Sequence, residues 1–197
     1  DAITYDEGAL IEPLGIGAFA VNRAEPVKTD VVAIFGAGTI GLAVLISLKA
    51  RGVSKIIVSE ISKMRLKLAG DLGADVLINA AQEDVTGRIA EVTGGRGLDI
   101  AIECTGARKP FFNALKALRI DGKLVLVGVF TQAFEFNPVT ISDKGLRIIG
   151  CMGDDYPGSA ALVNAQPGAF KKLISHVFPL EKAKEAFEMQ LKTEESV

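Results

Sequence analysis

Residues 31–41 read VVAIFGAGTIG, and this stretch decides the fold class. Five apolar residues run directly into a turn in which Gly36, Gly38 and Gly41 have the spacing G-x-G-x-x-G. Residues 42–51 then continue as a helix with an apolar face. A strand, a glycine turn and a helix in this order are the dinucleotide-binding element of doubly wound α/β folds.

Each position of the turn has a physical role in binding a phosphate group. Gly36 permits the sharp turn, Gly38 lets the backbone approach a pyrophosphate because it has no Cβ, and Gly41 lets the helix pack close to the strand. The free N–H groups at the start of the helix, at Thr39 and Ile40, then face the phosphate charge. All five residues are predicted to bind the cofactor, although an isolated motif of this kind also occurs in ordinary loops.

An acidic residue follows at the distance that this element requires. A second apolar run, residues 55–59, ends at Glu60, nineteen residues after Gly41, and a ribose-binding carboxylate is expected after roughly 20. The carboxylate would accept the adenosine-ribose hydroxyls and repel a 2′-phosphate, and Ile61 rather than an arginine follows it, so NAD is favoured over NADP. Arg65 is either a contact of the ribose or of Glu60, or an ordinary exposed helix residue.

The order of apolar runs along the chain predicts a parallel sheet. Strands that alternate with helices form a sheet covered on both faces, and six such strands suit the doubly wound Rossmann order 3-2-1-4-5-6. The expected strands are residues 31–35, 55–59, 75–78, 98–103, 123–127 and 146–151. The expected helices are residues 7–24, 39–51, 62–72, 83–93, 109–118, 159–173 and 180–192.

Three residues after the fourth predicted strand are candidates for the same site. In doubly wound folds, ligands bind at the carboxyl ends of the strands, beside the point where the strand order reverses. Cys104, Thr105 and Gly106 occupy that position and are predicted to border the adenine and the pyrophosphate. Cys104 is also expected to be a small buried apolar residue, which is compatible with this position.

Composition limits the classes of partner and the cellular compartment. The chain has 197 residues, 49% hydrophobic and 23% charged, which is enough for one domain with a sizeable core. The formal net charge of −2 gives no electrostatic basis for binding nucleic acid or an anionic membrane. No apolar run suits a membrane span, and the acidic N-terminus does not resemble a signal peptide. Cys104 and Cys151 form no C-x-x-C pair and fit a reducing cytoplasm.

Two features that invite a catalytic interpretation do not support one. His176 is the single histidine and has no cysteine or carboxylate at ligand spacing, so a structural role is expected. The aromatic residues after the fifth predicted strand alternate with polar residues and suit packing or an interface. They are Phe130, Phe134 and Phe136. No catalytic residue is predicted in this chain.

Taken together and in order, several segments resemble the medium-chain, zinc-dependent alcohol and polyol dehydrogenases. The resemblance is greatest to the sorbitol, butanediol and threonine dehydrogenase group, because of the Glu12-Pro13 pair. It covers nearly the whole chain. The segments that carry it are residues 7–14 (EGALIEPL), 36–41 (GAGTIG), 72–75 (LGAD), 99–106 (DIAIECTG), 122–128 (GKLVLVG) and 174–180 (ISHVFPL).

The resemblance implies an oxidoreductase that transfers hydride between a secondary alcohol or polyol and NAD, with zinc polarising the alcohol oxygen. It also implies that the backbone at Val127, Gly128 and Val129 and near Cys151 binds the nicotinamide carboxamide. Glu12 resembles the family's glutamate that reaches the catalytic zinc, directly or through water. Its alternative role is that of a surface acid before a proline.

The resemblance implies a division of the chain as well. Residues 1–27 would be a helical linker left from a catalytic domain, residues 28–153 the NAD-binding domain, and residues 154–197 helices that return toward the catalytic domain. The family's other zinc ligands are not in the sequence and no initiator Met begins it, so a fragment that binds NAD, but neither binds zinc nor turns over, is expected. Family members pair near residues 146–151, which predicts a homodimer or homotetramer.

Two other classes of function remain open at this level. One is a stand-alone NAD-binding or redox-sensing module without a catalytic partner domain. The other is a zinc-free enzyme of the quinone reductase type, against which the Glu12-Pro13 pair argues.

Overall fold

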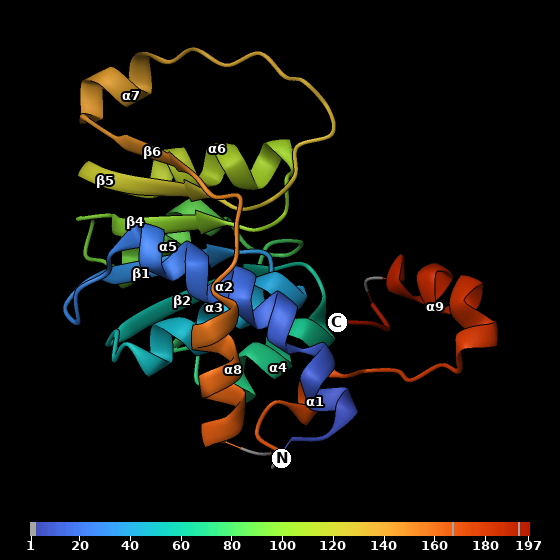
Figure 1. Ribbon diagram of the computed structural model, residues 1–197. Helices are drawn as coiled ribbons and strands as arrows, with labels where there is room; N and C mark the ends of the chain where they lie inside the picture. The colour runs from blue at the N-terminus through green and yellow to red at the C-terminus, as the bar shows by residue number, and fades with distance from the viewer. Residues whose placement is uncertain (1–2, 167, 193) are drawn as a thin grey trace.

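The structure is a computed structural model that describes residues 3–166, 168–192 and 194–197. Its centre is a six-stranded, all-parallel sheet with the strand order β3-β2-β1-β4-β5-β6 (Figure 1). This confirms the doubly wound order predicted from the alternating pattern. The strands are β1 (Val31–Phe35), β2 (Lys55–Glu60), β3 (Val76–Asn79), β4 (Leu98–Glu103), β5 (Leu118–Leu126) and β6 (Arg147–Gly150).

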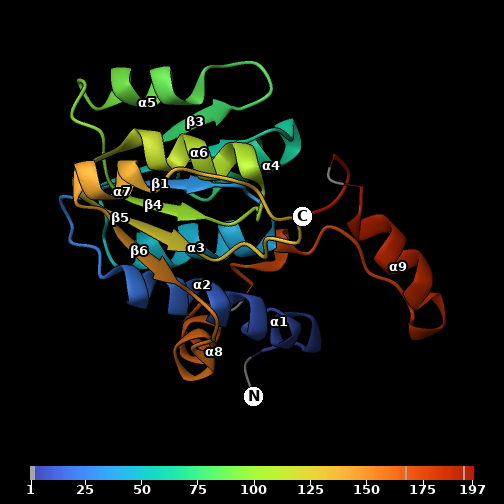
Figure 2. The same ribbon diagram turned by 90° about the horizontal axis from the view of Figure 1, so that it is seen from above.

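Helices lie on both faces of the sheet (Figure 2). Helices α2, α3, α4 and α8 contribute to one buried apolar cluster, and α5 and α6 contribute to a second cluster on the opposite face. The helices are α1 (Tyr5–Ala9), α2 (Ile11–Ala24), α3 (Thr39–Ala50), α4 (Lys63–Asp71), α5 (Val85–Val92), α6 (Arg108–Ala117), α7 (Val139–Lys144), α8 (Tyr156–Ala165) and α9 (Ala183–Gln190). Short 3₁₀ turns cover Lys171–Leu173 and Leu180–Lys182.

The two-sided cover explains why the central strands are continuous apolar runs. All six residues of β4 are buried, including its terminal acid, as expected for a strand covered on both faces. Helix α3 lies between the sheet and α2, and its residues from Gly41 to Leu48 are buried. The contact between α2 and α3 is very close. A Cβ built at Gly17 of α2 would lie 2.5 Å from the carbonyl carbon of Ala43.

The N-terminal region differs from the single helix expected over residues 7–24. It forms two helices, α1 and α2, that meet at Leu10. Thr4 and Glu7 form a reciprocal capping box that defines the start of α1. Pro13 is the third residue of α2, where a backbone N–H has no partner within the helix, so the proline costs no hydrogen bond.

Three other expectations about the elements were wrong. Strand β5 begins at Leu118 rather than at residue 123, because Asp121 and Gly122, which have the residue types of a turn, form an irregularity within the strand. Asp121 has a φ of 59°, and the pairing with β4 shifts register at this place. The segment between β5 and β6, for which no helix was expected, contains α7. The helix expected over residues 159–173 is the shorter α8, followed by a 3₁₀ turn.

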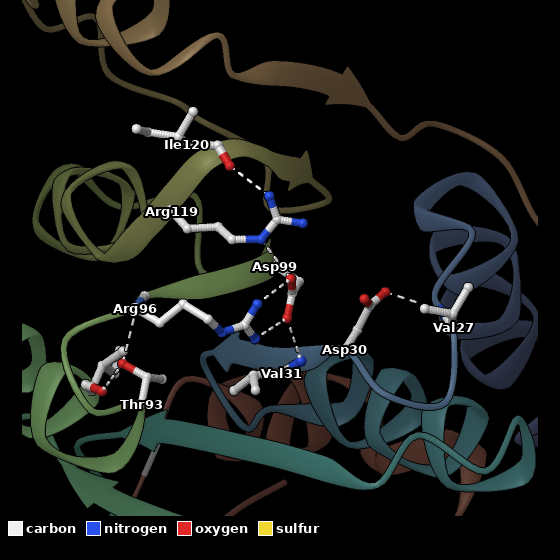
Figure 3. Close-up of polar contacts among 10 residues, drawn as sticks. Val27, Asp30, Val31, Thr93, Arg96, Asp99, Arg119 and Ile120 are labelled. Atoms are coloured by element: carbon white, nitrogen blue, oxygen red, sulfur yellow. Dashed lines mark hydrogen bonds and ion pairs between the residues drawn. The ribbon is translucent and has the colours of Figure 1, made fainter.

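The buried carboxylate of Asp99 links the amino ends of β1, β4 and β5, at the end of the sheet opposite the glycine turn (Figure 3). Asp99 accepts hydrogen bonds from both Nη atoms of Arg96, from Nε of Arg119 at 2.6 Å and from the N–H of Val31 at 2.8 Å. Burial alone would raise the pKa of Asp99, but these hydrogen bonds and the adjacent charges hold it at about 2, against an ordinary value of 3.8. The carboxylate therefore links β1, β4 and β5 as an anion.

Replacing Asp99 with asparagine is expected to lower the free energy of unfolding by about 2 kcal/mol at neutral pH. The folded pKa is depressed, so the contribution is fully present above about pH 4 and is lost as the pH falls toward about 2. Urea unfolding of both proteins at pH 7 and at pH 3 measures this. The difference between them should shrink at the lower pH, whereas the exposed Asp143→Asn control should resemble the parent at both. A constant difference would contradict the assignment.

Candidate functional site

The glycine turn has the geometry that the sequence requires of it. Gly36 has a φ of +96°, in the left-handed region, and its N–H donates to the carbonyl of Ser59 at 2.8 Å. Gly38 is the N-cap of α3 and provides no side-chain cap, so the N–H groups of the first turn are available to an anion. A Cβ at Gly41 would lie 1.9 Å from the carbonyl oxygen of Gly36, which explains why the helix can approach the strand only with glycine there.

A pocket of about 460 Å³ opens beside this turn, at the carboxyl ends of β1, β2 and β4. The strand order reverses between β1 and β4, so the pocket lies at the topological switch point where doubly wound folds bind ligands. Six of the ten predicted cofactor residues between Gly36 and Gly106 contribute to its lining: Gly36, Gly38, Glu60, Arg65, Cys104 and Thr105. Lys109 and Asn113 of α6 also line it, and the sequence pattern gave no sign of them.

Glu60 is a buried acid held in one orientation by the backbone. Its residue exposure is 7%. One carboxylate oxygen accepts from the N–H of Ala37 at 2.7 Å, and the other accepts from the N–H groups of Ile61 and Ser62 at 2.7 and 3.0 Å. The carboxylate is thus tied to both the glycine turn and the start of α4. Each oxygen retains lone-pair capacity toward the pocket.

Arg65 lies in the first turn of α4, where its N–H donates to the Ser62 hydroxyl that caps the helix. Its Nε donates to the carbonyl of Ser196 at 2.8 Å, so the guanidinium bonds the C-terminal segment rather than Glu60. Nη1 lies 3.6 Å from the position that a Cβ at Gly38 would occupy. The positive charge is therefore next to the glycine turn, which fits the pocket-facing alternative better than that of an ordinary surface arginine.

Glu103, which sequence reasoning missed, organises the loops after β4 and β5. It is fully buried, and its carboxylate accepts from the N–H of Thr105 at 2.8 Å, from the N–H of Gly106 at 3.0 Å and from the Thr105 hydroxyl. Burial raises the pKa of Glu103, against these hydrogen bonds. A Cβ at Gly128 would lie 2.6 Å from this carboxylate and 2.1 Å from the Gly106 nitrogen. An acid that ends an apolar strand before Thr-Gly is the signal that identifies it.

Four other predicted cofactor residues line a second hollow. It has a volume of about 610 Å³ and lies between α2 and the carboxyl ends of β5 and β6, where Val127, Gly128, Val129 and Cys151 line it. Gly106 lies against this strand end, since a Cβ there would be 2.2 Å from the Val129 carbonyl oxygen. Phe19 and Arg23 of α2 form its other wall. Burial raises the pKa of both Cys104 and Cys151, so neither thiol has the thiolate character of a nucleophile.

The glycine turn and its surroundings fit a dinucleotide, whereas the described residues do not by themselves form a zinc centre. In residues 3–166, 168–192 and 194–197 no three His, Cys, Asp or Glu side chains gather as metal ligands. Glu12 is exposed in the first turn of α2, and its predicted approach to zinc stays a prediction. His176 is exposed and lies against Ser175 and Phe178, and its structural role stays a prediction. Every helix in the described part of the chain is too short or too polar to cross a membrane.

Sequence comparison identifies the class of protein. Residues 39–165 match the family described as zinc-binding dehydrogenases, and the chain belongs to this family, which depends on a nicotinamide dinucleotide and zinc. The sorbitol dehydrogenase of Rattus norvegicus is 35% identical over an alignment of 193 residues that covers 95% of this chain and 54% of that protein. The chain spans about half the length of the curated relatives it matches.

Comparison with solved structures supports the assignment of the chain to this family. The 2R,3R-butanediol dehydrogenase of Bacillus subtilis is 32% identical and superposes with a TM-score of 0.89, covering 100% of this chain and 57% of that one. A putative zinc-binding dehydrogenase of Sinorhizobium meliloti, solved with NADP, is 26% identical and has a TM-score of 0.76, covering 81% and 48%. The resemblance drawn from the sequence, including the butanediol and sorbitol dehydrogenase group, is confirmed.

Proposed function

We propose that this chain binds NAD in an extended conformation along the carboxyl edge of its sheet. The pyrophosphate lies against the N–H groups of Thr39 and Ile40, beside Gly38, where the start of α3 attracts negative charge. The observation that carries the proposal is Glu60, a buried carboxylate fixed at the wall of the pocket by the glycine turn itself. It accepts the hydroxyls of the adenosine ribose.

The other candidate residues complete the path of the dinucleotide. Arg65, whose guanidinium lies beside the glycine turn, contacts the adenosine ribose, and the loop of Cys104, Thr105 and Gly106 borders the adenine and pyrophosphate. The backbone at Val127, Gly128 and Val129 and near Cys151 binds the nicotinamide carboxamide in the second hollow. Glu103 holds the loop after β4 through its carboxylate and the loop after β5 through its backbone carbonyl, so its contribution is to position backbone donors.

The choice of NAD over NADP rests on the chain's own residues. The Sinorhizobium meliloti relative was solved with NADP, so membership of the family leaves the choice open. A carboxylate at the ribose repels a 2′-phosphate, and Ile61 beside it offers no positive charge to bind one. We therefore infer NAD for this chain.

For the whole protein, we propose hydride transfer between a secondary alcohol or polyol and NAD. The support is the similarity to sorbitol and butanediol dehydrogenases. Zinc would polarise the alcohol oxygen, and Glu12 is the one acid of this chain proposed to face it. Residues 28–153 serve as the cofactor domain, residues 1–27 lead into it, and residues 154–197 lead back. The two free thiols fit a cytoplasmic location.

Calorimetric titration of the purified chain with NAD, and separately with NADP, tests the central proposal. A dissociation constant below millimolar for NAD, and binding at least tenfold weaker for NADP, is the expected result. An absence of heat and of any change in protein or cofactor fluorescence at millimolar NAD would remove the proposal. If NADP binds more strongly than NAD, the chain still binds a dinucleotide, and only the proposed role of Glu60 in choosing NAD is overturned.

We also propose that two copies of the protein associate through β6. This strand forms the edge of the sheet, and Ile148 within it is 39% exposed. Beside this strand lies a cluster of aromatic rings around Phe111. The ring centroids of Phe130, Phe134 and Phe136 lie 5.2 to 5.9 Å from that of Phe111, and the four rings line a hollow of about 460 Å³. The aromatic side chains thus pack against one another and also extend the apolar surface at the edge of the sheet, which a second copy of the protein would bury.

Ile148→Lys is expected to convert the assembly to a monomer, because a charge at the centre of an apolar edge would have to be buried on pairing. Light scattering at several concentrations measures the mass. Ile120→Lys is the matched control, since Ile120 is 67% exposed and lies at the amino end of the sheet, away from this edge. The interface assignment fails if the parent chain is monomeric or if both variants keep its mass.

A further inference from the structure

The segment between β5 and α7 is held by aromatic side chains rather than by backbone hydrogen bonds. Figure 1 shows residues 127–138 as a long loop without a helix or a strand. The N–H groups of Val127 and Gly128 both donate to the carbonyl of Glu103 at 2.9 Å, but within the described part of the chain no N–H group of residues 129–137 donates a hydrogen bond. A loop without such bonds keeps one conformation only where its side chains pack.

Phe130 is the first of these packed side chains and lies at the boundary of two hollows. It lines the second hollow together with residues 127–129, and it also lines the aromatic hollow around Phe111. Its ring centroid lies 5.9 Å from that of Phe111 and 5.8 Å from that of Phe134, both in T-shaped arrangements. Phe111 is only 6% exposed and belongs to α6 and the buried core. The ring of Phe130 therefore ties the backbone of residues 127–129 to a fixed part of the molecule.

Phe136 makes a comparable aromatic contact at a different place. Its ring centroid lies 5.5 Å from that of Phe111, and it lines the aromatic hollow. Among the three phenylalanines of the loop, Phe130 is the one that also lines the second hollow, where the nicotinamide is proposed to bind. The two rings thus contribute in the same way to the aromatic cluster, but only that of Phe130 adjoins residues 127–129.

We propose that Phe130 is a positioning residue for the nicotinamide half of the cofactor: its ring holds the backbone of residues 127–129 in the conformation that binds the carboxamide. The inference rests on the proposed binding of NAD. Without the ring, the loop from Val129 onward can move, and NAD must order it on binding, which lowers the affinity. The adenosine half is proposed to bind in the pocket beside the glycine turn, which other residues line, so its binding does not depend on Phe130.

Titration with NAD, and separately with ADP-ribose, which lacks the nicotinamide, tests this proposal. The intact chain should bind NAD at least about tenfold more tightly than ADP-ribose, as one or two net hydrogen bonds would provide. In Phe130→Ala this ratio should fall to about threefold or less, because NAD affinity falls and ADP-ribose affinity does not. Phe130→Leu keeps an apolar side chain at the boundary and should restore most of the ratio.

Phe136→Ala is the matched control and should keep the ratio of the intact chain. It removes a ring from the same aromatic cluster, so any loss of stability or of association between copies is common to both alanine variants. An unchanged ratio in Phe130→Ala, an equal fall in Phe136→Ala, or equal binding of NAD and ADP-ribose by the intact chain would overturn the proposal. If the intact chain binds neither ligand, the proposed function fails together with this inference.

Limited proteolysis gives a second measurement, which needs no variant. Chymotrypsin cleaves after phenylalanine, and the loop offers Phe130, Phe134 and Phe136 in a segment without backbone hydrogen bonds to hold it. Saturating NAD should slow cleavage within residues 130–136, whereas saturating ADP-ribose should leave the rate unchanged. Equal slowing by the two ligands would show that the loop responds to the adenosine half, and the assigned role of Phe130 would then be wrong.

Discussion

Gly41→Ala is expected to destabilise the fold by at least about 4 kcal/mol, the range of severe backbone clashes. The added Cβ would lie 1.9 Å from the Gly36 carbonyl oxygen and 2.9 Å from the Gly36 carbonyl carbon. Both are backbone atoms at the end of a buried strand, so neither can move without displacing β1 or α3. A thermal or urea unfolding curve should show a large drop in the midpoint, or an unfolded chain at room temperature.

Gly38→Ala is the matched control, because it changes the same motif by the same methyl group. Its Cβ would meet only Nη1 of Arg65, at an ordinary 3.6 Å, so the unfolding midpoint should stay within a few degrees of the parent. The methyl group would instead stand at the N-cap of α3, where the pyrophosphate is proposed to approach, and NAD should bind at least tenfold more weakly. Equal unfolding curves for the two variants would contradict the assigned packing of Gly41.

Glu60→Gln is expected to lower NAD affinity by tenfold to a hundredfold and to narrow the preference for NAD over NADP by at least tenfold. A hydrogen bond to a charged acceptor is worth about 1.5–3 kcal/mol, which corresponds to that loss for the ribose hydroxyls. The neutral amide also removes the repulsion of a 2′-phosphate. Calorimetric titration of both cofactors against both proteins gives the two ratios.

The glutamine substitution distinguishes the proposed contact of Glu60 with the ribose from its hydrogen bonds to the protein backbone. Glutamine retains one carbonyl oxygen, so part of the support that Glu60 gives to Ala37, Ile61 and Ser62 remains and the variant is expected to fold. Glu91→Gln removes an acid from the exposed ion pair with Arg88 on α5 and should leave both affinities unchanged. If Glu60→Gln keeps the parent's ratio of NADP to NAD affinity, the carboxylate does not choose the cofactor.

The parts of the fold predicted correctly are those determined by local sequence. Strand β1, the glycine turn and α3 follow from an unbroken apolar run, three glycines and a helical pattern, and the strand order follows from the alternation of such units. The start of β5 was missed because Asp121-Gly122 has turn chemistry, although pairing with β4 on both sides of these residues makes the two parts one strand. Tertiary pairing overrode a local signal there.

The residues of the candidate site also fall into those that local sequence predicts and those that only the tertiary structure reveals. Glu60 was identified because its spacing from the glycine turn is fixed by one strand and one helix, and the pocket places it where that spacing predicts. Glu103 was missed because it is one of many residues in an apolar strand, and only its burial reveals the loops it holds. The bond between Arg65 and Ser196 joins residues far apart in sequence, for which no local pattern exists.

The close packing of Gly17 against Ala43 has a mechanical consequence. With no side chain between them, α2 and α3 have no layer of flexible atoms on which to slide, so the two helices move as one solid piece. Glu12 lies on α2 and the glycine turn leads into α3, so the packing of the two helices fixes the distance between Glu12 and the glycine turn. A domain joined ahead of α2 could therefore change its orientation relative to α2 and α3 only through residues before Ile11, where α1 ends and α2 begins at Leu10.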